Sequence, residues 1–437
     1  MSTTNWGKYP VIPESPLSYK EGENPDKRWI PRGMGRCYGD SSLGEYMISS
    51  SRNQRILSFD KKKGIVRVEA GMTYEQLISI VMPHGWFPMV TPGTKFVSMG
   101  GAMASDVHGK NHHKDGGFSD WVVGFRLLTG KGEVLEVTPN ENKEIFEATA
   151  GGMGLTGFIL DLSLQLKKIE SNQIKLQSYK ATNLDEVLDL FEEHADWTYS
   201  VAWIDTLAKG KQAGRSILLL GEHATEEEVR QNGKAHSLAE VKKRRFTIPF
   251  DLPSFSLNPL TIGVFNQLYY HKHVGRERSI MTDYDSYFYP LDILHHWNRI
   301  YGKKGFTQYQ LVIPKAKGRE GLPNILTFLQ KNRLSSFLSV LKLFGPETGL
   351  MSFPMEGYTL TLDFPISNRL FPLLEELDQL VLSYGGRVYL TKDVRLPSDT
   401  FRKMYPNLSQ FEQTLSKLDP EGKVASLQSH RLAIRSL

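Results

Sequence analysis

The sequence predicts an α+β protein with two domains, and three observations support this fold class. The chain has 437 residues, which is more than a single hydrophobic core normally organises. Glycines are frequent in the first part of the chain, and their density falls from about residue 171 onward. Beyond that point the pattern runs strand, helix, strand, strand, helix. This order favours an antiparallel sheet covered by helices.

The composition is typical of a globular protein, with 40% hydrophobic and 23% charged residues. A net charge of +5 suits an anionic cofactor or substrate but is too small to indicate nucleic-acid binding. Cys37 is the only cysteine, so no intrachain disulfide can form, which favours a reducing compartment. We find neither a signal peptide nor an apolar run of about 18 residues, and we therefore expect a cytoplasmic protein.

Two glycine-rich stretches dominate the N-terminal part, namely Pro31–Ser42 and Thr91–His113. Glycine lets the backbone approach a ligand closely, and exposed N–H groups in such loops form concavities that bind anions. The segment between them predicts a strand over Gly64–Gly71 and a helix over Thr73–Gly85, with Thr73 as N-cap. We interpret the two stretches as a wall against a large flat cofactor with a phosphate tail, although surface loops can have the same composition.

A third group of glycines matches the dinucleotide-binding fingerprint in letters only, as Gly152-x-Gly154-x-x-Gly157. That fingerprint must follow a strand and open a helix. Here we predict a hairpin over Trp121–Pro139 and a helix over Asn142–Ala150 before it, and a strand over Phe158–Leu166 after it. Because the order is reversed, we reject the fingerprint.

The second half alternates between strand and helix patterns. We predict helices over Leu184–His194 and Leu370–Gly386, the second ending in a double glycine that favours a helix stop. Strand patterns occur at 198–206, 306–314, 334–345 and 358–366. The segment Val241–Arg278 is unusual because it combines many aromatic and cationic residues with prolines.

Several of these motifs together resemble the vanillyl-alcohol-oxidase class of FAD flavoproteins. Within this class the sequence is most similar to the decaprenylphosphoryl-β-D-ribose 2′-epimerase family, in its flavin oxidoreductase component. The resemblance covers nearly the whole chain in order, and the run Asp106–His113 is its most specific part. The other segments that carry it are Arg32–Asp40, Pro92–Thr94, Gly100-Gly101, Gly154–Gly157, Ser200–Trp203, Phe306–Gln310, Lys342–Pro346, Asp363–Pro365 and Lys392-Asp393.

The resemblance implies a two-domain PCMH-type FAD-binding fold with an inserted antiparallel-sheet substrate domain. Residues 1–170 would form the FAD-binding domain, residues 171–386 the substrate-binding domain, and residues 387–437 a segment that returns to the FAD domain. It also implies oxidation of the ribose 2′-hydroxyl of a polyprenyl-phosphoryl ribose, a lipid-linked sugar phosphate, to a 2′-keto intermediate. A separate NAD(P)H-dependent keto-reductase would complete epimerisation to the arabinose form, a precursor of cell-wall arabinan.

Removing a hydride from a secondary alcohol needs an electron acceptor that no side chain provides, so the cofactor must carry that step. The protein must position the alcohol and accept its proton. The resemblance places Lys392, His108, Tyr38, Gln310 and Lys342 in the catalytic site, with Lys110 close by. We assign Lys392 to positioning and electrostatics, with Tyr38 and His108 as rival bases. The cofactor-binding residues implied are Arg32, Gly33, Met34, Gly35, Arg36, Cys37, Tyr38, Gly39, Asp40, Ser41, Gly93, Ser98, Met99, Gly100, Gly101, Ser105, Asp106, Val107, His108, Ile159 and Tyr389.

Each of these residues also has a purely structural interpretation, because most lysines are solvated and many histidines only pack. The first glycine loop lacks the histidine that tethers flavin in many members of the class, so we expect noncovalent FAD. We interpret Cys37 as a small packing residue. Where the best-known epimerase members carry a cysteine, this chain has Thr361.

Other functions remain open from the sequence. A metal site could use His108, His112 and His113, but Gly109 weakens a helix there and the acidic residue of the zinc-protease pattern is missing, so we predict no metal. A polyol or aldonolactone oxidase that uses oxygen, and a nonenzymatic binding protein with a flavin fold, are the two alternatives.

The segment Val241–Arg278 also suggests contact with a peripheral membrane surface, because cations and aromatic side chains both suit an anionic interface. The alternative is a mobile loop that covers the active site. The residues concerned are Lys242, Lys243, Arg244, Arg245, Phe246, Phe250, Phe255, Phe265, Tyr269 and Tyr270.

Overall fold

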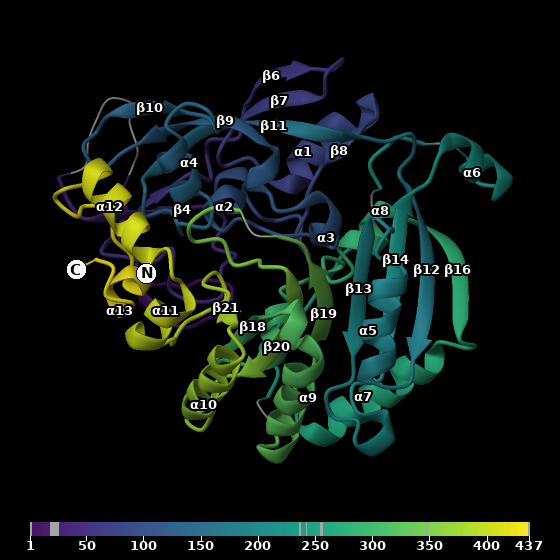
Figure 1. Ribbon diagram of the computed structural model, residues 1–437. Coiled ribbons are helices and arrows are strands. Elements are labelled where there is room, and N and C mark those ends of the chain that lie inside the picture. Colours follow the sequence, from purple (N-terminus) through teal and green to yellow (C-terminus); the bar gives the residue numbers. More distant parts are fainter. Residues whose placement is uncertain are drawn as a thin grey trace.

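Two antiparallel sheets organise the protein, one formed by N-terminal strands and the other mainly by the middle of the chain (Figure 1). The computed structural model describes residues 2–17, 26–235, 237–241, 243–253, 257–346 and 348–435. Lys242 and Phe255 of the unusual segment lie outside these residues. The mixture of sheets and helices agrees with the α+β class predicted from the sequence.

The first sheet has six strands in the order β10-β9-β11-β7-β6, with β8 pairing separately with β11. The predicted hairpin is confirmed, because β9 and β10 pair antiparallel on either side of a turn. The rejection of the dinucleotide fingerprint also holds, since its glycines follow α4 (Lys143–Thr149) and lead directly into β11. The strands are β6 (Ile56–Asp60), β7 (Ile65–Glu69), β8 (Trp86–Pro88), β9 (Val122–Leu128), β10 (Val134–Val137) and β11 (Phe158–Lys168).

Short helices connect the strands of this half. The expected N-cap is confirmed at α1 (Tyr74–Val81), where Thr73 and Gln76 form a reciprocal capping box that satisfies two otherwise free N–H groups. The second glycine-rich stretch contains α2 (Met99–Ala104), capped by Ser98, and α3 (His112–Asp115). Before this sheet come the short strands β1 (Ser2–Thr3), β2 (Ile12–Pro13), β3 (Pro16–Leu17), β4 (Trp29–Arg32) and β5 (Tyr46–Ser49).

The second sheet has eight strands in the order β16-β12-β14-β13-β19-β20-β18-β21, and every pair in it is antiparallel. This agrees with the sheet that the alternating pattern predicted. The strands are β12 (Gln173–Ala181), β13 (Tyr199–Ile204), β14 (Ser216–His223), β16 (Glu277–Asp283), β18 (Phe306–Pro314), β19 (Ser339–Phe344), β20 (Gly357–Pro365) and β21 (Arg387–Val388).

One face of the second sheet is covered by α5 (Leu184–Glu193), α9 (Lys315–Lys331) and α10 (Leu370–Ser383) (Figure 1). The helices α5 and α10 were predicted, and α10 is followed by the left-handed Gly385, with φ of +73°. We did not predict α9. Leu311, Leu341 and Leu360 point from the central strands into the core beneath these helices. Because side chains alternate along a strand, their neighbours point to the opposite face.

The unusual segment is more regular than a mobile loop. It contains β15 (Phe246–Thr247), which pairs with β17 (Leu294–His295), and the 14-residue helix α7 (Pro259–Lys272). Asn258 caps α7 and Pro259 occupies its first turn, where a missing N–H does no harm. The remaining helices of the middle region are α6 (Glu226–Gln231) and α8 (Tyr284–Phe288).

The C-terminal segment joins both halves of the molecule. It begins in the second sheet as β21 and continues through α11 (Ser398–Met404), α12 (Leu408–Leu418) and α13 (Leu427–Arg431). Between α12 and α13, Val424 forms a parallel bridge with Trp29 of β4.

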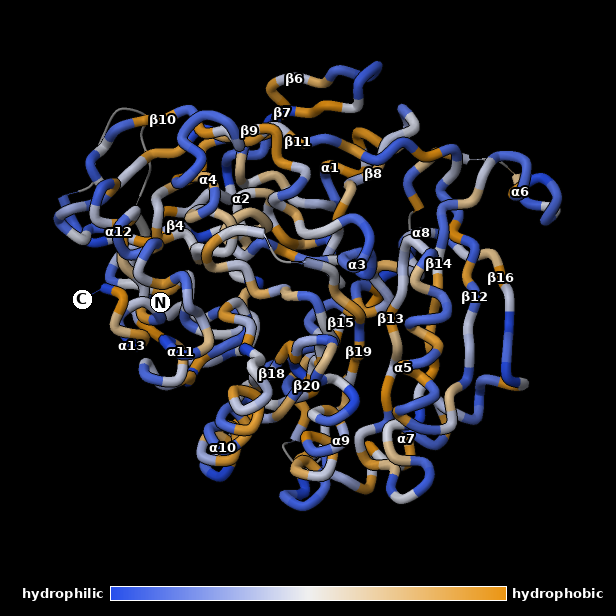
Figure 2. The backbone as a smooth tube through the Cα atoms, viewed as in Figure 1, coloured by the Kyte–Doolittle hydropathy of each residue, from blue (hydrophilic) through white to orange (hydrophobic). Residues whose placement is uncertain are grey.

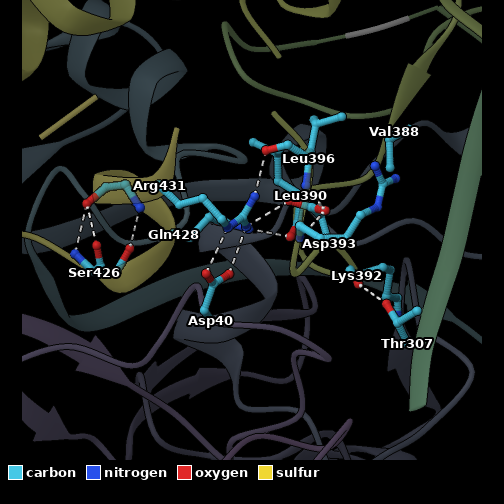
Figure 3. A network of polar contacts seen from close by, with 12 residues as sticks. Asp40, Thr307, Val388, Leu390, Lys392, Asp393, Leu396, Ser426, Gln428 and Arg431 are labelled. Carbon is cyan, nitrogen blue, oxygen red and sulfur yellow. Dashed lines mark hydrogen bonds and ion pairs between the residues drawn. The ribbon is translucent and has the colours of Figure 1, made fainter. Parts of the chain in front are cut away.

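The side chain of Arg431 holds the C-terminal segment against the first glycine loop (Figure 3). Its Nη2 donates to Asp40 Oδ1 and to Asp393 Oδ2, each at 2.9 Å, and its Nη1 donates to the Leu396 carbonyl at 2.8 Å. The side chains of Asp40 and Asp393 are only 7% and 1% exposed, and Arg431 is the cation that both carboxylates share. One side chain thus ties the first glycine loop to the segment that contains Lys392.

We predict that Arg431→Ala lowers the free energy of unfolding by about 3 kcal/mol, because it leaves two buried carboxylates without their shared cation. Arg319→Ala is the matched control, since Arg319 pairs with Asp189 at the surface and such pairs contribute at most about 1 kcal/mol. Urea unfolding of the three proteins measures both values. Equal losses in the two variants would show that the Arg431 network is not a structural tie.

Candidate active site

The open face of the second sheet collects polar side chains from three neighbouring strands. Gln308 and Gln310 of β18 lie opposite Asp363 and Thr361 of β20 in the strand register, and Lys342 of β19 lies opposite Thr359. These residues alternate with core leucines, so they share the face turned away from α9. Polar groups in the middle of a sheet are unfavourable unless they bind each other or a ligand.

His108 lies against this face. Its Nε2 is 2.8 Å from the Nε2 of Gln310, so the histidine nitrogen accepts a hydrogen bond from the glutamine amide. The ring packs against Phe344 and Tyr389, with centroid distances of 4.7 and 5.1 Å. Burial, reinforced by the charge of Lys342, moves the pKa of His108 well below its ordinary value. The neutral ring then carries its proton on Nδ1, which has no partner among the described residues.

Lys392 enters the same space from the C-terminal segment. Its Nζ lies 4.1 Å from the centre of the Tyr38 ring, a distance at which a cation is attracted to an aromatic face. Burial lowers the pKa of Lys392 to about 8, and the nearby carboxylate of Asp363 partly offsets this effect. Lys392 therefore holds its proton less tightly than a solvated lysine.

Asp363 is the carboxylate whose charge favours the ammonium form of Lys392. Gln308 Nε2 donates to its Oδ1 at 2.6 Å, and the Tyr301 hydroxyl donates to its Oδ2 at 3.1 Å. Gln308 also reaches the hydroxyl oxygen of Tyr38 at 3.3 Å. Burial raises the pKa of Asp363 to about 6, against these hydrogen bonds and the charge of Lys392. The Asp363 carboxylate thus interacts with Lys392 through its charge and is joined to Tyr38 through Gln308.

Two further half-buried lysines carry positive charge into the site. Burial, together with the neighbouring charge of Lys392, lowers the pKa of Lys342 to about 7. Burial and then Lys342 lower the pKa of Lys110 to about 7 as well. The Nζ of Lys110 lies 4.1 Å from the Tyr287 ring centre and donates to the Tyr287 carbonyl. Neighbouring ammonium groups that lower one another's pKa in this way form a site suited to a strongly anionic ligand.

The two glycine-rich stretches meet beside these residues. A side chain at Gly33 would place Cβ 2.3 Å from Ser98 Oγ, and one at Gly39 would place it 1.9 Å from the Asp393 carbonyl oxygen. The Tyr38 N–H also donates to the Thr391 carbonyl at 3.0 Å. The first loop therefore has to be glycine-rich to fit against the second loop and the Lys392 segment.

These surroundings fit a flavin dinucleotide. Gly93 has open space where a side chain would stand, which leaves its backbone accessible. The buried Tyr74 hydroxyl and His108 Nδ1 both lack partners among the described residues, and buried polar groups are normally satisfied. A polar, flat cofactor can supply such partners.

Several predicted cofactor residues have side chains that already bind within the protein. The Arg32 guanidinium donates to the Thr4 carbonyl at 2.9 Å, and Asp106 accepts from the Ser119 N–H at 3.0 Å. Cys37 Sγ lies 3.2 Å from Ser42 Oγ, and the Tyr389 hydroxyl donates to the Ser105 carbonyl at 2.8 Å. These residues shape the loops, so any contact of theirs with a cofactor would come mainly from the backbone.

The remaining predicted positions are spread over several elements. Met34 is 38% exposed at the tip of the first loop, whereas Val107 and Ile159 are buried. The second loop contributes a close backbone contact, since a Cβ on Gly100 would lie 2.8 Å from that of Ala70. The structure therefore brings Tyr38, His108, Gln310, Lys342, Tyr389 and Lys392 together, and their catalytic roles stay predictions.

The three histidines considered for a metal have separate partners. His112 accepts from the Gly345 N–H at 3.2 Å, and His113 Nε2 lies 2.9 Å from the Trp197 carbonyl. Among the described residues there is no cluster of three potential metal ligands.

Sequence reasoning missed Gln308, Asp363 and Tyr301 as site residues. Gln308 and Asp363 stand within quoted motifs, and strict alternation from Gln310 and Thr361 would have placed both on the same face. Tyr301 belongs to a short 3₁₀ turn (Trp297–Tyr301), for which the sequence offers no such signal.

Comparison with known proteins gives the class of the molecule. Residues 20–138 match the family described as FAD binding domain. The chain is 36% identical over 411 residues, 93% of its own length and 89% of the relative, to decaprenylphosphoryl-β-D-ribose oxidase of Mycolicibacterium smegmatis. It is 31% identical, over 83% of the chain and 100% of the relative, to an uncharacterized protein in the mprA 5′ region of Streptomyces coelicolor. L-gulonolactone oxidase of Bos taurus is 22% identical over 96% of the chain and 95% of its own length.

The protein is an FAD-dependent oxidoreductase. More narrowly, the chain belongs to the family of the M. smegmatis decaprenylphosphoryl-β-D-ribose oxidase. The resemblance inferred from the motifs is thereby confirmed. Every helix in the described part of the chain is too short or too polar to span a bilayer.

We predict that Asp363→Asn shifts the pH dependence of flavin reduction to lower pH. Removing the carboxylate charge takes away support for the ammonium of Lys392, so its pKa should fall from about 8 by roughly one unit. Stopped-flow measurement of anaerobic flavin reduction by the lipid-linked ribose substrate, from pH 6 to 10, records the limb of the pH profile that reports the pKa of Lys392. Glu375→Gln on the exposed side of α10 is the control, and an unmoved limb in Asp363→Asn would contradict the pairing.

Proposed function

We propose that the enzyme oxidises the 2′-hydroxyl of a polyprenyl-phosphoryl-β-D-ribose to the 2′-keto sugar, the first half of epimerisation to the arabinose form. The observation that carries this proposal is the group of half-buried lysines, Lys110, Lys342 and Lys392, beside the glycine loops. A lipid-linked sugar phosphate needs cations for its phosphate and polar groups for its ribose. The name of the M. smegmatis relative, an oxidase of decaprenylphosphoryl ribose, supports the same substrate.

Bound FAD supplies the acceptor for the hydride. On the protein side, the ammonium of Lys392 orients the 2′-hydroxyl, with Asp363 and Tyr38 fixing the lysine. Lys342 and Lys110 face the sugar phosphate. Gln310 and His108 complete the ribose site, since Gln310 holds the ring of His108 through Nε2 and leaves the Nδ1–H free to donate.

The same contacts bear on which group takes the hydroxyl proton. Burial raises the pKa of Tyr38 well above its ordinary value, so the phenolate is strongly disfavoured. His108 uses Nε2 as an acceptor for Gln310 and is therefore a poor base. Because the pKa of Lys392 is about 8, part of it is the neutral amine near neutral pH, and this form can accept the hydroxyl proton, whereas the ammonium form orients the hydroxyl.

We also propose the division of labour within the chain. Residues 1–170 hold FAD, residues 171–386 form the inserted substrate-binding domain, and residues 387–437 return to the FAD domain. The antiparallel pairing of the second sheet and the contact of Arg431 with Asp40 support this division. A separate NAD(P)H-dependent keto-reductase would reduce the 2′-keto product, and a polyprenyl substrate would bring the enzyme to a membrane surface.

We predict that FAD is bound noncovalently, through the backbone of the two glycine loops. Residues 31–42 contain no histidine, and the thiol of Cys37 is engaged with Ser42. Acid precipitation of the yellow protein should leave all flavin absorbance in the supernatant. Yellow colour that stays with the precipitate would contradict this prediction.

We predict that polyprenyl-phosphoryl-β-D-ribose bleaches the flavin under anaerobic conditions, whereas the corresponding xylose and glucose lipids do so weakly. Lys392→Ala should retain FAD but reduce the bleaching rate by about 10²-fold, the usual effect of losing one such group. Single-turnover absorbance at the flavin maximum measures both.

The distant likeness to L-gulonolactone oxidase makes an oxygen-using polyol or aldonolactone oxidase the second candidate. Hydrogen peroxide formed with xylitol or gulonolactone, without bleaching by the ribose lipid, would favour that function. A parent-like rate in Lys392→Ala would show that the lysine is only structural.

A further inference from the structure

The helix α7 has an apolar face that the rest of the described protein leaves exposed. Leu260, Val264 and Leu268 are 75%, 53% and 68% exposed, and their spacing of four residues aligns them on one side of the helix. Single exposed leucines are common on protein surfaces, but an aligned row on one helix is a feature of interaction surfaces. The helix α7 lies at the lower edge of the view in Figure 2, and parts of its tube are coloured as hydrophobic.

The opposite side of α7 is firmly held. Asn266 Nδ2 donates to Asp205 Oδ1 at 2.7 Å, and Asp205 forms a buried ion pair with Arg215 at 2.8 Å. The Tyr270 hydroxyl donates to the Ala181 carbonyl at 3.2 Å. The outer row is therefore presented by an anchored helix.

An apolar path connects this helix with the candidate active site. Tyr269 of α7 packs on Trp203 of β13 with ring centroids 4.8 Å apart. Trp203 lies opposite Val340 of β19, and Val340 lies opposite Thr361, the partner of Gln310. Along this series of mostly buried neighbours the side chains change from polar at Gln310 to aromatic at Trp203, and the series ends at the exposed aliphatic face of α7. This is the order of groups in a sugar joined through phosphate to a hydrocarbon chain.

Positive charge accompanies the apolar row. Lys272 stands in the last turn of α7, and Lys209 and Lys211 lie on the loop that follows Asp205. All three are exposed and have no acidic partner among the described residues. In contrast, Lys243 and Arg245 of the cationic run that first suggested membrane contact are ion-paired with Asp283 and Glu75. Lys272, Lys209 and Lys211 are therefore available to an anionic surface near α7, and the exposed Arg244 is the one described cation of that run without an ion pair.

We propose that the outer face of α7, formed by Leu260, Val264 and Leu268, docks the enzyme on an anionic lipid bilayer. The aliphatic row enters the boundary of headgroups and acyl chains, and the flanking lysines contact lipid phosphates. The polyprenyl chain of the substrate then stays largely in lipid, while the sugar phosphate reaches the site past Trp203 and Val340. This proposal rests on the proposed function for the nature of the substrate, whereas the docking itself can be measured without it.

The test compares the FAD-loaded parent with the triple variant Leu260→Ser/Val264→Ser/Leu268→Ser. The control is Leu57→Ser/Val134→Ser, which removes exposed apolar side chains, 43% and 44% accessible, from the first sheet. Co-sedimentation with vesicles of phosphatidylglycerol and phosphatidylcholine, and with vesicles of phosphatidylcholine alone, measures binding. We expect the triple variant to bind anionic vesicles at least about tenfold more weakly, and the control to bind like the parent.

FAD content and thermal unfolding check that each variant is folded, and bleaching by a short-chain, water-soluble phosphoryl ribose checks the active site. Unchanged bleaching with lost vesicle binding supports the docking surface. Vesicle binding that is unchanged in the triple variant, or lost equally in the control, overturns it. The proposal is also overturned if the triple variant changes from dimer to monomer in light scattering while its vesicle binding stays the same. In that case the outer face of α7 would be a contact between two copies of the protein. If no phosphoryl pentose bleaches the flavin but vesicle binding still depends on α7, the proposed substrate fails and the docking surface stands.

Discussion

The ion pairs of Arg431 with Asp40 and Asp393 are the constraint on which the site depends. Burial by itself raises the pKa of Asp393, yet Arg431 and Arg395 more than offset this and hold it below its ordinary value. The Asp393 carboxylate is therefore charged, whereas burial raises the pKa of Asp40 despite Arg431, and a buried charge persists only beside its counter-ion. Because Asp40 ends the first glycine loop and Asp393 follows Lys392, this pairing sets the distance between Tyr38 and the lysine that faces its ring.

Strand alternation supplies the other half of the site. On β18, β19 and β20 every second residue packs under α9 and α10, and the residues between them form the polar floor. The same hydrophobic burial that stabilises the sheet thus fixes which face carries Gln310 and Lys342. A register slip of one residue would exchange the leucine core for the polar groups, so the site and the core are specified together.

The sequence was informative where local chemistry agrees with the fold. The N-cap at Thr73, the hairpin around Gly132 and the antiparallel sheet all follow from short-range patterns. The helix α9 was hidden by Gly318, Gly321 and Pro323, residues that normally interrupt helices. A Cβ on Gly318 would lie 2.4 Å from the Tyr358 ring, so close packing accounts for that glycine.

The helix α7 was hidden for a different reason. It is apolar on its inner and outer sides, so its sequence has no amphipathic period to indicate a surface helix. Asp363 and Gln308 show how far the site could be predicted from the sequence. Their residue types were visible in the sequence, but their contacts with Tyr301 and Tyr38 depend on strand register and on a turn far away in the chain. Motifs identify residues, whereas the geometry of the fold decides which of them meet.

The electrostatics of the site follow from placing the half-buried Lys110, Lys342 and Lys392 near one another. Their pKa values of about 7, 7 and 8 lie below the value of a solvated lysine, so the unfolded chain binds more protons than the folded one between pH 7 and 10. These lysines therefore reduce stability at neutral pH, and their unfavourable contribution shrinks as the pH rises toward 10. A phosphate placed among them raises all three pKa values and reverses part of that loss. The energy that the fold gives up to bury the lysines thus returns when an anionic substrate binds, which makes the site selective for charge before any contact with the ribose is formed.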